Sequence, residues 1–180
     1  AITLARRGVE VWLWARTEDE ASQLRERREN VRFVPGAEFP QSLDVTASPD
    51  EALQEAELVI IAVPSRSMRD NLRQVRDSLG GSVAIVSATK GLELDTGKRM
   101  SQVLSEELPP SLRPSVCALS GPNLAGEIAR EKPSSTVVAS ANMDAARTAQ
   151  SHISTPLFRV YTNDDIVGVE FGGALKNIIA

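Results

Sequence analysis

The sequence contains few residues of the kinds that cross-link a fold or bind metals. It has one cysteine, Cys117, and one histidine, His152, in 180 residues. One cysteine cannot form an internal disulfide, so a reducing compartment fits, and we expect the cytoplasm. We interpret Cys117, in the apolar run SVCALS, as a small core residue. With one histidine no convincing Ser-His-Asp set can be assembled, and no cluster of metal ligands is present.

Long apolar runs and excess positive charge are also missing. The longest purely apolar run, LVIIAV, is far shorter than the ~20 residues that span a bilayer. A formal net charge of −4 argues against a domain that binds nucleic acid through phosphate contacts. The start, AITLARRG, lacks the order of a signal peptide and opens inside a helical pattern that stops at Gly8. The other end stops in the apolar NIIA, so we expect a fragment cut at both ends.

Strand patterns alternate with helix patterns along the whole chain. The predicted strands are 9–15, 43–47, 58–63, 82–89, 115–121, 135–140 and 158–162. The predicted helices are 17–30, 48–56, 65–79, 97–108, 123–131, 142–154 and 164–180. This order predicts one α/β domain over residues 1–180, with a mostly parallel sheet and helices on both faces. The uninterrupted apolar run at 58–63 predicts a strand buried on both faces.

Ligands of open α/β sheets bind beyond the carboxyl ends of the strands, so the residues after each strand are candidates. Arg16 and Thr17 follow the first strand, where an arginine suits a 2′-phosphate, although a solvated arginine is the alternative. Lys90 could face a cleft or be an ordinary surface lysine. In SGPN, Gly121 permits close approach of a backbone, and Asn123 could contact a ligand or cap the next helix.

Lys176 stands in an apolar, glycine-rich helix, which is an unusual place for a lysine. Gly168, Gly172 and Lys176 are four residues apart and share one helix face. The glycines would clear space in front of that face, and a partly desolvated lysine there is a usable acid or base. The alternative is a lysine that extends to the surface, with both glycines serving only helix packing.

Four segments together carry a family resemblance. ATKGLE, LSGPNLAGEIA, FRVYTNDDIVGVEFGGALKN and ARRGVEVWLWAR resemble the bacterial NAD(P)-dependent glycerol-3-phosphate dehydrogenases over nearly the whole chain. The resemblance implies a Rossmann-like N-terminal domain, a helical C-terminal domain, and NADPH or NADH as cofactor, with NADPH favoured by Arg16. It also implies interconversion of dihydroxyacetone phosphate and sn-glycerol 3-phosphate for glycerophospholipid synthesis. The expected partner is this small-molecule substrate, and a homodimer is left open.

The same resemblance implies roles for individual residues. Lys176 would be the active-site lysine that exchanges a proton with the reacting oxygen, and Lys90 would touch both cofactor and substrate. The implied contacts are Gly121 and Asn123 for the substrate, and Arg16, Thr17, Ala125 and Asn177 for the cofactor.

Two features separate this chain from the family pattern. The glycine-rich loop and first strand would precede Ala1, and the helical domain would follow Ala180, so we expect the chain alone to be inactive. The loop RFVPG also differs from the family's segment. A non-catalytic nucleotide-binding module and a dehydrogenase of another hydroxy acid or sugar acid, such as the 6-phosphogluconate type, remain alternatives. A sensor has no need of both Lys90 and Lys176, which favours the enzyme.

Overall fold

The computed structural model describes residues 1–81 and 83–179. The strands are β1 (Val11–Trp14), β2 (Leu43–Thr46), β3 (Leu58–Ile61), β4 (Ala84–Ser87), β5 (Val116–Ser120), β6 (Ser134–Ala139) and β7 (Phe158–Asn163). The α-helices are α1 (Ile2–Ala5), α2 (Glu18–Arg27), α3 (Pro49–Leu53), α4 (Met68–Val75), α5 (Met100–Glu107), α6 (Ala125–Ala129), α7 (Met143–Ile153) and α8 (Ile166–Ile179). Short 3-10 helices are η1 (Ser65–Ser67), η2 (Arg76–Ser78) and η3 (Pro110–Ser115). The predicted alternation of strands and helices is confirmed.

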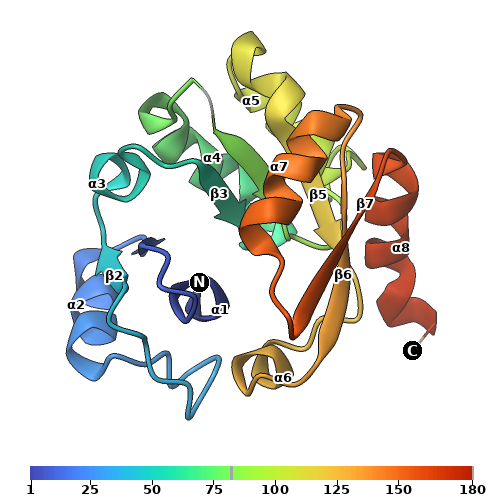
Figure 1. The fold of residues 1–180 in the computed structure, drawn as a ribbon. Coiled ribbons are helices and arrows are strands. Elements are labelled where there is room, and N and C mark those ends of the chain that lie inside the picture. Colours follow the sequence, from blue (N-terminus) through green and yellow to red (C-terminus); the bar gives the residue numbers. More distant parts are fainter. Residues whose placement is uncertain (82, 180) are drawn as a thin grey trace.

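The strands form two sheets (Figure 1). One holds β1 and β2 in parallel, and the other has the order β3-β4-β5-β6-β7. Pairing within the larger sheet is parallel except between β5 and β6. The prediction of a mostly parallel α/β sheet is therefore confirmed, although the sheet is in two pieces.

Helices cover both faces of the larger sheet because neighbouring residues of a strand point to opposite sides. Ile85 and Val116 join the core formed with α4 and α5. Val86 and Cys117, the next residues along β4 and β5, join the core formed with α7. Helix α8 packs along β5 and forms the right-hand side of the view in Figure 1.

The smaller sheet has its own core and is connected to the rest by arginines of the first helix and turn. Leu43 and Val45 of β2 pack with Ala5 of α1 and Ala21 of α2. The Arg6 guanidinium donates to the carbonyl of Ala129 at 2.6 Å. Arg7 donates to the carbonyls of His152 and Ser154 at 2.8 and 2.9 Å, so α1 is attached to the ends of α6 and α7. No helix in the described part of the chain is both long and apolar enough to cross a membrane.

The expectation for residues 58–63 is wrong in one respect. Strand β3 is not buried on both faces, and Ile60 is 36% exposed. The reason is that among the described residues β3 is an edge strand of the five-stranded sheet, paired with β4 alone, and Ile60 lines a cavity. A continuous apolar run does not distinguish such a strand from a central one.

Two predicted helices begin later than expected. The helix predicted at 123–131 is α6, and its N-cap residue is Leu124 rather than Asn123, because the Asn123 side chain bonds across to β6 instead. The helix predicted at 97–108 begins at Met100, because residues 92–99 form a narrow loop in which Leu92 and Arg99 pair as an antiparallel bridge.

Candidate active site

The segments that follow β3, β4 and β5 meet at one edge of the larger sheet. The Thr89 hydroxyl, after β4, donates to the carbonyl of Val63, after β3, at 2.8 Å. Gly91 has φ +102°, and a Cβ atom there would lie 3.4 Å from the Ser65 hydroxyl oxygen. Only glycine adopts this backbone conformation without strain. The predicted gathering of strand-end residues is thus confirmed for these three strands.

Lys90 reaches across this edge to the segment after β5. Its Nζ donates to the carbonyl oxygen of Gly121 at 3.0 Å. The pKa of Lys90 is lowered, first by burial and then by the positive charge of Lys176. Geometry agrees, because a Cβ atom at Gly173, one turn of α8 before Lys176, would lie 3.9 Å from the Lys90 Cγ atom.

The Asn123 amide is oriented by a chain of two hydrogen bonds. Thr136, on β6 and 2% exposed, donates its hydroxyl proton to the carbonyl of Ser120 at 2.9 Å. The same hydroxyl oxygen stands 2.9 Å from the Asn123 Nδ2 atom. A hydroxyl has one proton, and a carbonyl oxygen cannot donate, so Thr136 must accept the bond from Asn123. The Asn123 Oδ1 atom therefore points away from Thr136, and it is buried without a hydrogen-bond donor among the described residues.

Gly121 is required by the close approach of β6. A Cβ atom at this position would lie 3.0 Å from both the Ser135 carbonyl oxygen and the Thr136 Cα atom. These are backbone atoms that cannot move aside without shifting the strand. Any larger residue at 121 would therefore displace the carbonyl that holds Lys90.

The glycines of α8 do not act as the sequence suggested. A Cβ atom at Gly168 would collide with the carboxylate of Asp165, and Gly172 faces open space. The close contact is made by Gly173, where a Cβ atom would lie 2.5 Å from the Ser120 hydroxyl oxygen and 3.9 Å from the Lys90 Cγ atom. Gly173 thus lets α8 press against β5 and the Lys90 side chain, and Lys176, partly buried, follows one turn later.

A cavity of about 270 Å³ lies beside these groups. Lys90 and Asn123 contribute to its wall, together with apolar side chains that include Ile60 and Leu119. Thr3 adds a hydroxyl, so the side chains of the lining combine an ammonium, an amide, a hydroxyl and an apolar surface. A small polar molecule with an anionic or carbonyl oxygen and a hydroxyl group would find a partner for each at this edge.

The residues predicted to bind the cofactor lie at separate places. Arg16 is exposed after β1, and among the described residues no hydrogen bond or ion pair engages its side chain. The Thr17 hydroxyl accepts from the backbone of Glu20 at 3.2 Å, which makes it the N-cap of α2. Ala125 is exposed at the first position of α6. The side chain of Asn177, in the last turns of α8, lies outside the described residues.

Four residues near the site were not found from the sequence. They are Ser120, Thr136, Gly173 and Glu170. Ser120 and Thr136 end or interrupt apolar strand patterns, which is a weak signal, and Gly173 is indistinguishable from Gly172 until the orientation of α8 is known. Glu170 could have been noticed as a carboxylate within an apolar, glycine-rich helix.

Comparison with known proteins shows which family this chain resembles in sequence. Residues 1–146 match the family described as "NAD-dependent glycerol-3-phosphate dehydrogenase N-terminus". A relative from Dehalococcoides mccartyi, named glycerol-3-phosphate dehydrogenase [NAD(P)+], is 49% identical over 98% of this chain and 50% of its own length. One of the same name from Chlorobium limicola is 46% identical over 100% of this chain and 54% of its own length. The chain thus spans about half the length of the curated relatives it matches.

Solved structures give the same result. A crystal structure of glycerol-3-phosphate dehydrogenase from Coxiella burnetii superposes with a TM-score of 0.88 at 29% identity, over 99% of this chain and 54% of the other. That of the Plasmodium falciparum enzyme has a TM-score of 0.82 at 26% identity, over 94% and 48% of the two chains.

Proposed function

The chain belongs to the NAD-dependent glycerol-3-phosphate dehydrogenase family, and on this basis we propose that it is the nucleotide-binding half of an enzyme that interconverts dihydroxyacetone phosphate and sn-glycerol 3-phosphate. The observation that carries the proposal is the pair of lysines. Lys90, bonded to the Gly121 carbonyl, and Lys176, close enough to lower its pKa, come from distant elements to one sheet edge. A protein that only bound nucleotide would have no need to hold two cations near one another.

In the proposed reaction the chain's own residues transfer the proton and stabilise the negative charge that develops on the substrate. A bound nicotinamide cofactor would supply the hydride in reduction and accept it in oxidation. Lys176 gives a proton to the carbonyl oxygen of dihydroxyacetone phosphate as hydride reaches its carbon, and takes the proton back in the reverse direction. Lys90 remains charged beside that oxygen and stabilises the negative charge that develops there.

Asn123 would accept a hydrogen bond from the hydroxyl group of the substrate. Within the described part of the chain its Oδ1 atom is an acceptor without a donor, and a buried acceptor left unpaired costs about 1–3 kcal/mol. The hydroxyl of dihydroxyacetone phosphate is a donor of suitable type. Gly121 would contribute through its carbonyl oxygen, which holds Lys90 at the site.

The residues after β1 fit the adenosine end of a nicotinamide cofactor. The Arg16 side chain is exposed and could pair with a 2′-phosphate, which supports a preference for NADPH. Three acidic residues follow in the first turn of α2, but the nearest, Glu18, pairs with Arg25. Ala125, exposed at the start of α6, and Asn177 complete the proposed cofactor contacts.

Activity would belong to a longer protein that contains this domain. In the doubly wound strand order 3-2-1-4-5-6, the first strand lies between those that correspond to β1 and β3, where the sheet is divided here. We propose that a preceding strand with its glycine-rich loop fills that place. A helical domain would cover the exposed apolar side of α8 formed by Val167, Phe171 and Leu175. With its single buried thiol, Cys117, the protein suits the reducing cytoplasm.

The test uses the full-length protein, purified and assayed for oxidation of NADPH or NADH that depends on dihydroxyacetone phosphate. We expect Lys90→Ala to lower kcat/KM by about 10²-fold or more, because a fixed cation beside a developing oxyanion is removed. Lys132→Ala, which removes an exposed lysine paired with Glu127, is the matched control. Turnover of a 2-keto acid or a sugar acid in place of dihydroxyacetone phosphate would identify another dehydrogenase, and cofactor binding without any turnover would identify a non-catalytic module. The mass in solution would show whether a homodimer forms.

A further inference from the structure

Helix α8 carries a buried carboxylate that the proposed reaction does not use. The Glu170 side chain is 8% exposed and accepts three hydrogen bonds. They come from the Arg99 Nη1 atom at 2.6 Å, the Ser101 backbone at 2.8 Å and the Ser101 hydroxyl at 2.6 Å. The Ser101 backbone N–H belongs to the first turn of α5, where a negative charge is favourable. Glu170 thus acts as the cap of α5, although it lies on another helix.

The partner of Glu170, Arg99, is joined to Lys90 through a short closed loop. Lys90 and Arg99 flank the loop 91–98, which is closed by the Leu92–Arg99 bridge and by a bond from the Glu93 backbone to the Lys98 carbonyl at 2.9 Å. One end of this loop carries Lys90, and the other carries the arginine that holds Glu170. The loop therefore links the segment that carries Lys90 to α8, which carries Lys176, through the Arg99–Glu170 contact.

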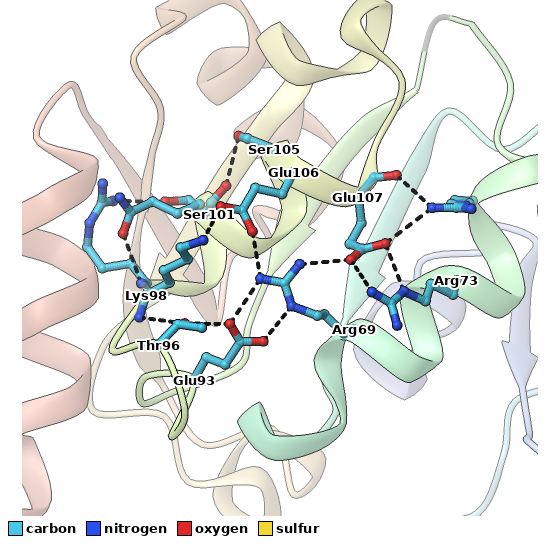
Figure 2. Close-up of polar contacts among 12 residues, drawn as sticks. Arg69, Arg73, Glu93, Thr96, Lys98, Ser101, Ser105, Glu106 and Glu107 are labelled. Carbon is cyan, nitrogen blue, oxygen red and sulfur yellow. Dashed lines mark hydrogen bonds and ion pairs between the residues drawn. The ribbon is translucent and has the colours of Figure 1, made fainter.

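The loop itself is fixed from the other side by the ion-pair network in Figure 2, which centres on Arg69 of α4. Arg69 contacts both carboxylate oxygens of Glu93, at 2.7 and 2.9 Å, a bidentate arrangement that restrains orientation as well as distance. It also contacts Glu106 at 2.6 Å and Glu107 at 2.7 Å. Because Glu93 is anchored in this way, the Lys90–Arg99 segment is a firm support for Glu170.

Helix α8 is thus held at two points before Lys176. Glu170 fixes it to α5 and Arg99, and Gly173 fixes it against Ser120 and the Lys90 side chain. Two contacts three residues apart restrain both the rotation of a helix about its axis and its sliding along that axis. We propose that Glu170 is a positioning residue that holds Lys176 opposite Lys90 through Arg99 and Ser101. The proposal rests on the reaction proposed above, in which the relative placement of the two lysines decides the rate.

The experiment compares two carboxylates in the full-length protein. Glu170→Gln keeps the size of the side chain but removes the charge that Arg99 and the α5 terminus require. Glu107→Gln is the matched control, because its side chain is also 8% exposed and also pairs with arginines, Arg69, Arg73 and Arg76, without contact to α8. Arg69 binds Glu107 through Nη1 and Glu93 through Nε and Nη2, so the control does not remove the bonds that anchor the loop. We expect both variants to lose stability in urea.

Only Glu170→Gln should alter the site. Its kcat should fall by ten- to a hundredfold, on the order expected for a misplaced catalytic group, with KM for the cofactor nearly unchanged. Among the described residues Lys176 is the charged group that shifts Lys90, so the pKa of Lys90, followed by NMR titration, should rise in Glu170→Gln but not in Glu107→Gln. Ser101→Ala, which removes one donor to Glu170, should give a smaller change in the same direction and carries the test if Glu170→Gln does not fold.

If Glu170→Gln keeps the kcat of the control, or leaves the Lys90 titration unchanged, Glu170 is only a helix cap and the proposal is wrong. The NMR titration needs no substrate. If the unmodified protein fails to act on dihydroxyacetone phosphate, the proposed function fails, while the titration still reports whether Glu170 places Lys176.

Discussion

The Thr136 hydroxyl accepts a 2.9 Å hydrogen bond from the Asn123 amide and at the same time gives its own proton to Ser120. The two bonds fix the orientation of the Asn123 amide, whose Oδ1 atom is buried and points away from Thr136. In the reaction proposed above, a substrate hydroxyl would therefore meet an oxygen rather than an NH₂ group. Thr136 orients Asn123 from β6. Along the chain, α6 and a loop separate the two residues.

Replacing Thr136 by valine should remove this orientation at nearly constant volume. The amide of Asn123 is then free to rotate, and the Ser120 carbonyl loses a donor. We expect KM for dihydroxyacetone phosphate to rise by about tenfold, the equivalent of one well-placed hydrogen bond. Thr136→Ser, which keeps the hydroxyl, should stay near the unmodified value in the same steady-state assay. Equal effects of both variants would mean that packing, not the hydroxyl, matters at this position.

Replacing Lys176 by alanine should cut turnover by at least about a hundredfold, because general acid–base help of this kind contributes ~10²–10⁴-fold. NADPH should still bind. Lys176→Arg should rescue little, since a guanidinium does not release its proton near neutral pH. Single-turnover hydride transfer, measured beside a cofactor titration, separates the two effects. Surviving turnover would make Lys176 a packing residue, whereas collapse of cofactor binding would make it structural.

Replacing Arg16 by alanine should raise KM for NADPH more than KM for NADH. The exposed guanidinium would lose a charge-assisted bond to the 2′-phosphate, which NADH lacks. Arg27→Ala, on the exposed side of α2, is the control for a general loss of positive charge. The two cofactors are compared in parallel steady-state assays. An equal effect on both would show that Arg16 does not discriminate between them.

The lowered pKa of Lys90 predicts how stability depends on pH. Between the folded-state pKa and the ordinary value of 10.5, the unfolded chain binds more protons than the folded one, so the free energy of unfolding rises with pH across that window. Lys176→Met removes one cause of the shift. It should therefore raise the pKa of Lys90. The free energy of unfolding, measured by urea denaturation at several alkaline pH values, should then rise less steeply with pH. An unchanged slope would show that burial alone lowers the pKa.

The Arg69 network predicts sensitivity to acid. Hydrogen bonds from Arg69 and Thr96 lower the pKa of Glu93 to about 2, so its contribution to stability is present above about 4.5 and is lost as pH falls toward 2. Glu93→Gln should lower stability at pH 7 and reduce the loss between pH 5 and 2. Thermal unfolding over that range measures the difference. Parallel curves for the variant and the unmodified protein would contradict the assignment.

The sequence was a good guide to the elements and a partial guide to the site. Alternating strand and helix patterns located every strand, and the rule that ligands bind beyond strand ends brought Lys90, Gly121 and Asn123 together correctly. These inferences depend on local periodicity and on chain direction, which a sequence displays.

The missed features depend on which elements become neighbours. Thr136 matters because β6 pairs with β5 in the antiparallel direction, which no local pattern announces. Gly173 rather than Gly172 meets Ser120 because of the rotation of α8, and that rotation is set by the distant pair Arg99–Glu170. Ile60 was misjudged for the same reason, since an edge strand and a central strand can have identical apolar runs.

The Cys117 side chain is fully buried on β5, and burial raises the pKa of its thiol to about 11. A thiol in that state is almost entirely protonated at neutral pH and out of reach of alkylating reagents. Since the chain has no other cysteine, alkylation of a thiol in this chain reports on Cys117 alone. The rate of reaction with a maleimide or iodoacetamide would measure how often the centre of the larger sheet opens, without an engineered cysteine.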